Sequence, residues 1–207
     1  MKERPIIMGA DSVRAILDGR KTQTRRVVNE KALDRFKFSP SGELLGSFNE
    51  SHPEWEIYPT VDDAPYRVGD RLWVRETWAE AHYWTNDVDA ETPIYLASDY
   101  KTPIKPVVWK SPMFMPRWAS RITLEITDIR VGRVQDITPE DAKAEGIKVL
   151  PLQDDSDPSA WYQYAPGIFQ ARSATKSYEL LWDSLNAKRG YSWESNPWVW
   201  VISFKVV

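Results

Sequence analysis

The stretch "RWASRITLEITDIRV", residues 117–131, contains the clearest strand pattern of the chain. Ile122, Leu124 and Ile126 would lie on one face of this strand, and the polar residues between them would lie on the other. Alternation with a period of two is typical of a strand that is buried on one side. The stretch therefore predicts a strand whose apolar face covers the core of the protein.

Two further segments show the same alternation. In "RLWVRET", residues 71–77, Leu72, Val74 and Glu76 would share a face, so a carboxylate falls on the apolar side. Three interpretations of Glu76 stay open: a strand end that reaches water, an ion pair with an arginine, or a functional role. The segment "NPWVWVISFKVV", residues 196–207, alternates over a greater length and predicts a well-covered, central strand of the sheet.

Three segments predict short helices. "ADSVRAILDG", residues 10–19, has an apolar stripe and ends at Gly19, which suits the left-handed backbone that follows many helices. "DITPEDAKAEGI", residues 136–147, has Thr138 in position to cap the helix and a proline at the first helical position. "SYELLWDSLNAKRG", residues 177–190, places apolar and aromatic side chains at helical spacing.

The mixture of short strands and short helices predicts a mixed α+β or barrel-like β fold. With 207 residues, 42% of them hydrophobic, the chain is long enough for one domain with its own core. Three irregular segments interrupt the pattern and are interpreted as insertions, near residues 30–65, 82–113 and 148–172. We therefore expect a single domain over residues 1–207.

Composition and charge narrow the classes of function. The net charge of −3 argues against a protein that binds duplex DNA, because such proteins are clearly basic. The chain has no cysteine, and its two histidines, His52 and His82, lie in different segments, so it offers few ligands for zinc. We therefore expect no metal and no cofactor. The N-terminus lacks a long apolar run, so we expect no signal peptide, no membrane partner and a cytoplasmic location.

The segment "GRKTQTRR", residues 19–26, raises the question of chemistry. A threonine hydroxyl needs a base before it can attack a substrate, and a lysine of lowered pKa is such a base. Lys21 and Thr24 would share a face on a helical turn but would point to opposite sides of a strand. Their partnership therefore requires a turn after Gly19. The alternative, a polar loop with exposed cations, stays open.

Two further groups of side chains are suited to a functional site. Glu145 ends the predicted helix of residues 136–147, where the helix dipole disfavours a carboxylate; a solvated glutamate is the alternative interpretation. "MPRWASR" brings Arg117, Trp118 and Arg121 together ahead of the strand. Arginine beside tryptophan suits stacking on a base and binding a phosphate, and it equally suits a surface arginine over a core tryptophan.

Gly19, Lys21, Thr24 and Arg26 together resemble the signature of the ASCH domain family. The segments "GDRLWVRETW", "MPRWASRITLEITDI", "ITPEDAKAEGI" and "NPWVWVISFK" are similar to those of the larger ASCH proteins of bacteria and phages. The resemblance covers both ends and the middle of the chain, outside the three insertions. It implies a PUA-like fold, which is a small β-barrel with short helices packed over it and a cleft suited to nucleic acid or nucleosides.

One branch of this family removes the acetyl group from the exocyclic amine of cytidine. The resemblance to that branch implies catalytic roles for three residues. Lys21 would take the proton of Thr24, Thr24 would attack the acyl carbon, and Glu145 would position Lys21 or water. Water activated by Lys21 or Glu145, with Thr24 only binding, stays open. Five residues are expected to bind the substrate: Arg26, Glu76, Trp78, Arg117 and Arg121.

The sequence is thus interpreted as an amidohydrolase of the N4-acetylcytidine type, which acts on a nucleoside without a metal. Two alternatives come from other classes of function. One is a non-catalytic module that binds RNA or a modified nucleoside, and the other is a metal-independent ribonuclease. The free base, the nucleoside and RNA all stay open as the substrate.

Overall fold

The computed structural model describes residues 1–28, 36–38, 44–47, 64–80, 93–98, 107–150, 161–167 and 169–207. Five strands form one mixed sheet in the order β1-β5-β8-β11-β2. β1 runs parallel to β5, and the other neighbouring pairs are antiparallel. The bounds of these strands are Glu3–Ile7 for β1, Gln23–Val27 for β2, Arg71–Arg75 for β5, Thr123–Arg133 for β8 and Trp198–Val206 for β11.

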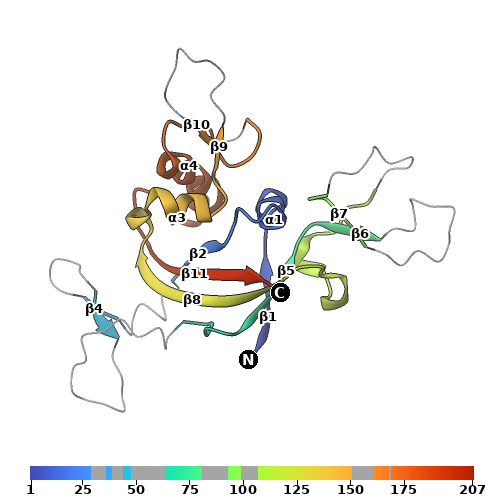
Figure 1. Ribbon diagram of the computed structural model, residues 1–207. Helices are drawn as coiled ribbons and strands as arrows, with labels where there is room; N and C mark the ends of the chain where they lie inside the picture. The colour runs from blue at the N-terminus through green and yellow to red at the C-terminus, as the bar shows by residue number, and fades with distance from the viewer. Residues whose placement is uncertain are drawn as a thin grey trace.

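Helices and three two-stranded sheets surround the main sheet. The α-helices are α1 (Ala10–Leu17), α3 (Pro139–Ala144) and α4 (Ala174–Asn186). Short 3-10 helices are η3 (Pro112–Phe114), η4 (Arg117–Ala119), η5 (Val134–Asp136) and η6 (Ala187–Arg189). The small sheets pair β3 (Phe36–Phe38) with β4 (Leu44–Ser47), β6 (Trp78–Glu80) with β7 (Pro93–Tyr95), and β9 (Lys148–Leu150) with β10 (Trp161–Gln163). Figure 1 shows α3 and α4 grouped near β9 and β10, with α1 beside β2 and β5.

Strand β11 contributes side chains to two of the three hydrophobic clusters of the described residues. Trp200, Ile202 and Phe204 belong to one buried cluster, with side chains of β1, β5, β8 and α1. Val199 and Val201 point to the opposite face and belong to a second cluster, with side chains of α3 and α4. β11 pairs with β8 on one side and with β2 on the other. The strand is thus paired along both edges and has buried apolar side chains on both faces, which confirms its predicted central position.

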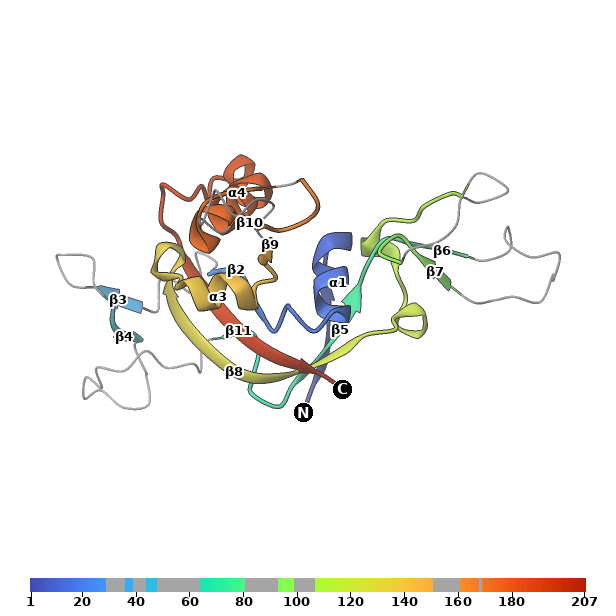
Figure 2. The same cartoon turned by 45° about the horizontal axis from the view of Figure 1, so that its top comes forward.

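The α+β class is confirmed by this arrangement of strands and helices. Figure 2 shows β8 and β11 curving together across the molecule. The described strands pair as an open sheet with β1 and β2 at its edges, so closure into a barrel stays a prediction. A side chain connects the two edges: Nη2 of Arg26, on β2, donates to the carbonyl oxygen of Ile7, on β1, at 3.1 Å.

The other predicted elements also appear, with shifted ends. The strands expected at residues 71–77 and 117–131 correspond to β5 and β8. The last helix begins at Ala174, earlier than predicted, because the Ser173 hydroxyl caps it by accepting from the backbone N–H of Lys176 at 3.1 Å. The predicted insertions near 30–65 and 82–113 lie mostly outside the described residues, as do both histidines, whereas more than half of the one near 148–172 is described and contains β9 and β10. Among the described helices, none is long and apolar enough to cross a membrane.

Candidate active site

The chain turns sharply after α1 before it enters the sheet. Gly19 adopts a left-handed backbone with φ of 71°, and the N–H groups of Arg20 and Lys21 both donate to the carbonyl oxygen of Ala15 at 2.9 Å. Extended backbone begins only at Gln23, the first residue of β2. The turn that the sequence required is therefore present. Lys21 lies in the turn, whereas Thr24 lies in the strand.

The Lys21 side chain is buried, with 4% of its surface exposed. Its Nζ donates to the carbonyl oxygens of Gln23 at 2.9 Å and Glu145 at 2.8 Å, and to Oε2 of Glu145 at 2.6 Å. All three donors of the ammonium group are thus in use. Burial lowers the pKa of Lys21 below its ordinary 10.5, the ion pair with Glu145 opposes this shift, and the nearby charges of Arg26 and Arg25 add to it.

Glu145 is the C-terminal cap of α3, and the start of that helix is fixed by Thr138, whose hydroxyl accepts from the backbone N–H of Asp141. Two cations hold its carboxylate: Lys21 on Oε2, and Arg25 on Oε1 at 3.2 Å. They offset the unfavourable end of the helix dipole. The close approach also depends on Gly146, which has φ of 107° and where an added Cβ would lie 3.0 Å from the Cβ of Ala15.

Thr24 has a different partner from the one that the sequence suggested. Residues two apart in a strand share a face, so Thr24 and Arg26 lie on the same side of β2. Nη1 of Arg26 donates to Oγ1 of Thr24 at 2.9 Å. Among the contacts of the described residues, Lys21 and Thr24 make no hydrogen bond with each other. The two side chains nevertheless line one cavity.

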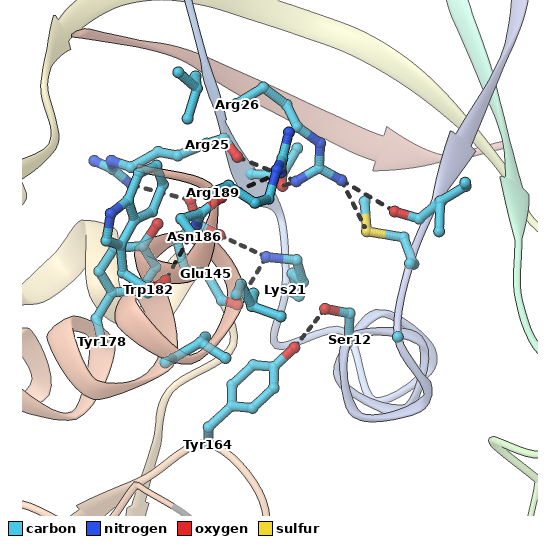
Figure 3. A pocket seen from close by; sticks show the side chains of 17 residues that line it. Ser12, Lys21, Arg25, Arg26, Glu145, Tyr164, Tyr178, Trp182, Asn186 and Arg189 are labelled. Atoms are coloured by element: carbon cyan, nitrogen blue, oxygen red, sulfur yellow. Dashed lines mark hydrogen bonds and ion pairs between the residues drawn. The ribbon is translucent and has the colours of Figure 1, made fainter. Parts of the chain in front are cut away.

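This cavity has a volume of about 410 Å³ and opens beside β2, α1, α3 and α4. Figure 3 shows Lys21, Glu145 and Arg26 converging on it. Aromatic rings form part of its wall: Tyr178 and Trp182 from α4, and Tyr164, whose hydroxyl is hydrogen-bonded to Ser12 of α1. Burial raises the pKa of Tyr164 to about 12, so its hydroxyl stays protonated at neutral pH. The full lining is Ile7, Met8, Gly9, Ser12, Lys21, Thr24, Arg25, Arg26, Val27, Glu145, Tyr164, Tyr178, Leu181, Trp182, Leu185, Asn186 and Arg189.

Four of the residues expected to bind substrate are absent from this lining: Glu76, Trp78, Arg117 and Arg121. Glu76, Trp78 and Arg121 lie in a second region, around Tyr95 and Met115. Arg117 instead binds Glu3 and lies near the ring of Trp73. Arg121 binds both carboxylate oxygens of Glu76, at 2.9 and 3.0 Å, and its guanidinium lies 4.0 Å from the centre of the Tyr95 ring. The ion-pair interpretation of Glu76 is therefore confirmed. Its burial follows from this pairing, and the geometry of the pocket does not support a role for these four residues in the same site.

The pocket also contains residues that the sequence did not suggest. Arg25 donates to both Glu145 and Asp141 beneath the ring of Tyr178. Tyr178 and Trp182 were expected as the apolar stripe of a helix, and they form pocket wall as well as core. The only local signal for Arg25 was its place within "GRKTQTRR", because its acidic partners lie more than a hundred positions away in sequence.

In the described residues, no group of three or more acidic or histidine side chains gathers as metal ligands would. No model of a protein family matches the sequence, and a search of curated proteins finds no match either. Among solved structures, the chain is similar to an ASCH domain from Lactobacillus crispatus, with 15% sequence identity and a TM-score of 0.38. The similarity covers 99% of this chain and 79% of that one. A likeness this remote carries no argument about function.

Proposed function

We propose that the chain is an ASCH-type hydrolase that removes the acyl group from the exocyclic amine of an N4-acylated cytidine or cytosine. The observation that carries this proposal is the buried ion pair of Lys21 and Glu145 at a cavity that Thr24 and Arg26 also line. These positions are the ones that resemble the family signature and its hydrolase branch. Structural lysines seldom sit buried, with lowered pKa, beside a cavity large enough for a ligand.

In the proposed mechanism, Lys21 acts as the base. Neutral Lys21 has two N–H donors and one lone pair, so it gives up one of the three hydrogen bonds that Nζ donates in the structure. The lone pair then accepts a hydrogen bond from a water molecule. Lys21 takes a proton from this water, and the oxygen adds to the acyl carbonyl carbon. The C–N bond then breaks, and the proton passes from Lys21 to the leaving amine nitrogen. Glu145 holds the Lys21 side chain in position throughout.

The contact between Arg26 and Thr24 favours binding, rather than attack, as the role of Thr24. Because Oγ1 of Thr24 accepts from Arg26, the hydroxyl hydrogen of Thr24 is free to donate elsewhere. Directed into the cavity, this hydrogen stabilises the acyl oxygen as negative charge develops on it. The aromatic wall of Tyr164, Tyr178 and Trp182 offers flat, apolar surface to a cytosine ring.

Hydrolysis is tested by following the ultraviolet spectrum of N4-acetylcytidine as it is converted to cytidine by the purified protein. Glu145→Gln is compared with Glu76→Gln, since both remove the charge of a buried, ion-paired carboxylate and only Glu145 lines the cavity. We expect Glu145→Gln to lose most of the activity and Glu76→Gln to keep it. Absence of conversion by the wild-type protein contradicts the proposal for this substrate.

The role of Thr24 is tested by mass spectrometry of the protein during turnover. A covalent mechanism leaves an acyl group on Thr24, whereas the water mechanism leaves the protein mass unchanged. We expect no acyl-protein, and we expect Thr24→Ser to retain more activity than Thr24→Val because only serine keeps the hydroxyl donor. Trapping an ester on Thr24 would exclude the water mechanism.

A second candidate function, an RNA-binding module, is favoured by the surface near η3 and η4. Met113, Phe114 and Trp118 are largely exposed there, at 61%, 74% and 63% of their surface, beside the cation Arg117. Exposed aromatic rings beside arginine suit stacking on unpaired bases. A salt-sensitive gel shift with single-stranded RNA, without hydrolysis of N4-acetylcytidine, would favour this function. RNA cleavage that survives Lys21→Ala would instead indicate a ribonuclease with a different site.

A further inference from the structure

The charges that line the cavity fall into two groups. Four cationic side chains and one carboxylate line it. The inner cations are compensated, because Lys21 and Arg25 both bind Glu145 and Arg25 also binds Asp141 at 2.7 Å. The other two cations are Arg26 and Arg189. Within the part of the chain that the structure describes, neither of these arginines has a carboxylate partner.

Arg26 donates only to neutral groups. Its acceptors are Oγ1 of Thr24, the carbonyl oxygens of Arg25 and Ile7, both at 3.1 Å, and the sulfur of Met8 at 3.7 Å. These contacts fix the direction of the guanidinium group, which is half-buried, and leave its charge uncompensated. A fixed cation at the wall of a cavity attracts an anionic ligand, because the cavity excludes part of the water that would screen it.

Arg189 lies in η6, just after α4, and is exposed at the rim of the cavity. Its single hydrogen bond is long: Nη1 donates to Oδ1 of Asn186 at 3.5 Å. Arg189 and Arg26 both line the cavity, and in the view of Figure 3 the Arg189 side chain is directed toward the side on which Arg26 lies. The two guanidinium groups therefore approach one opening from different elements, one held firmly and one with little to restrain it.

The geometry points to a phosphate subsite at the cavity opening, formed by Arg26 and Arg189, so that the preferred substrate is a phosphorylated cytidine rather than the free nucleoside. The inference rests on the proposed function. A nucleotide carries its phosphate on the ribose, at a distance from the acylated amine, so one cavity can hold the amine at Lys21 and the phosphate at its opening. Guanidinium groups match phosphate oxygens in geometry and charge. The chain as a whole has a net charge of −3, so the attraction comes from this opening and not from the protein surface in general.

The test compares four substrates: N4-acetylcytidine, its 5′-monophosphate, its 3′-monophosphate, and a short oligoribonucleotide that contains one N4-acetylcytidine. We expect kcat/KM to be about tenfold or more higher for a phosphorylated substrate than for the nucleoside, as one charge-assisted contact typically provides. A gain with a monophosphate assigns the subsite to free nucleotides, and a gain confined to the oligonucleotide assigns it to RNA. Equal values for all four substrates overturn the inference.

Arg189→Gln and Lys188→Gln provide a matched pair of variants. Both remove one positive charge from η6, and only Arg189 lines the cavity. Arg189→Gln is expected to bring the ratio of kcat/KM for phosphorylated and free nucleoside close to one, whereas Lys188→Gln keeps the wild-type ratio. An equal loss in both variants would mean general electrostatic attraction and would overturn the subsite.

Direct binding separates this inference from the proposed function. Calorimetric titration with cytidine and with cytidine 5′-monophosphate needs no hydrolysis. If no substrate is hydrolysed, the proposed function fails, while tighter binding of the monophosphate that depends on Arg189 still supports the subsite. If the nucleoside is hydrolysed, no phosphorylated substrate gains in kcat/KM, and the monophosphate binds no more tightly than cytidine, the proposed function stands and the subsite fails.

Discussion

Two buried glutamates in this molecule form ion pairs with cations from distant parts of the chain. Glu145 pairs with Lys21 at 2.6 Å, and Glu76 pairs with Arg121 through both carboxylate oxygens. Both carboxylates are almost fully covered, at 3% and 1% exposed. The first pair lines the cavity beside β2, and the second pair does not belong to the lining of that cavity. The second is packed by Tyr95 and by Met115, whose sulfur accepts from the backbone N–H of Glu76.

The difference lies in the cation. Arginine stays protonated in proteins and forms two parallel hydrogen bonds with a carboxylate, so the pair of Arg121 and Glu76 connects the segment before β8 to the end of β5 without taking or giving a proton. Lysine is a compact charge whose pKa falls on burial. The pair of Lys21 and Glu145 is therefore able to gain and lose a proton. Burial of a charged side chain does not by itself indicate a site, whereas a buried lysine at an open cavity does.

The largest expected effect is that of removing the proposed base. Lys21→Ala should lower kcat/KM for N4-acetylcytidine by about 10²–10⁴-fold, the usual contribution of a general base. Lys21→Arg should be equally inactive, because arginine keeps its proton. The rate of the ultraviolet change measures both. As the matched exchange, Arg121→Lys keeps a cation beside Glu76 and should keep the rate. Near-wild-type activity of Lys21→Arg would exclude Lys21 as the base.

The second effect is on stability. Arg121→Met leaves the Glu76 carboxylate buried without its cation, which should lower the free energy of unfolding by about 3 kcal/mol. Urea denaturation measures this change. The double variant Arg121→Met, Glu76→Leu should recover most of the loss, because it removes the charge as well. A loss of hydrolysis in the single variant at unchanged stability would move Arg121 into the active site.

The third effect is a dependence of the hydrolysis rate and of stability on pH, which we expect from the pair of Lys21 and Glu145. Because burial lowers the pKa of Lys21 below 10.5, its neutral form grows as pH rises, and hydrolysis should increase about tenfold per pH unit until that pKa is reached. Between that pKa and 10.5 the unfolded chain binds more protons than the folded one, so the free energy of unfolding should also rise with pH. A rate of hydrolysis that falls as pH rises toward the pKa of Lys21 would exclude this residue as the base.

The smallest effect comes from removing the N-terminal caps of two helices, α3 beside Lys21 and Glu145, and η3 in the second region. Thr138→Ala removes the cap of α3, which positions Glu145, and should cost about 1 kcal/mol of stability together with some activity. Ser111→Ala removes the comparable cap of η3, in the second region, where the Ser111 hydroxyl accepts from Met113. It should leave hydrolysis unchanged. Urea denaturation and the hydrolysis assay measure the two variants side by side.

The sequence predicted the elements whose signals are local. Alternation in β8 and β11 and the cap at Thr138 depend only on neighbouring residues, and these features were confirmed. The turn after Gly19 was recognised as a condition for the site, and it is present. The contact of Arg26 with Thr24 was not predicted, and the period-two rule explains it only now that β2 is seen to contain both residues.

Contacts between distant segments were not predictable in the same way. The end of a helix drew attention to Glu145, but its partnership with Lys21 came from the resemblance alone, because the two residues are 124 positions apart. Arg189 and Tyr164 reach the cavity from elements whose sequences indicate only a helix end and an irregular segment. The pairing of Arg121 with Glu76 outside the lining of this cavity was not predictable for a related reason. Arginine, tryptophan and glutamate suggest a binding site equally well when they bind one another.

The place of β2 in the sheet has a consequence for the order in which the protein assembles. Among the described strands, β2 pairs with β11 alone, although β2 lies near the start of the sequence and β11 near its end. During synthesis on the ribosome, Thr24 and Arg26 therefore emerge long before the strand that aligns them. Contacts between such distant segments form late in folding because of the chain entropy that they cost. The cavity beside β2 thus appears only when β11 docks, so a partly synthesised chain lacks the assembled cavity.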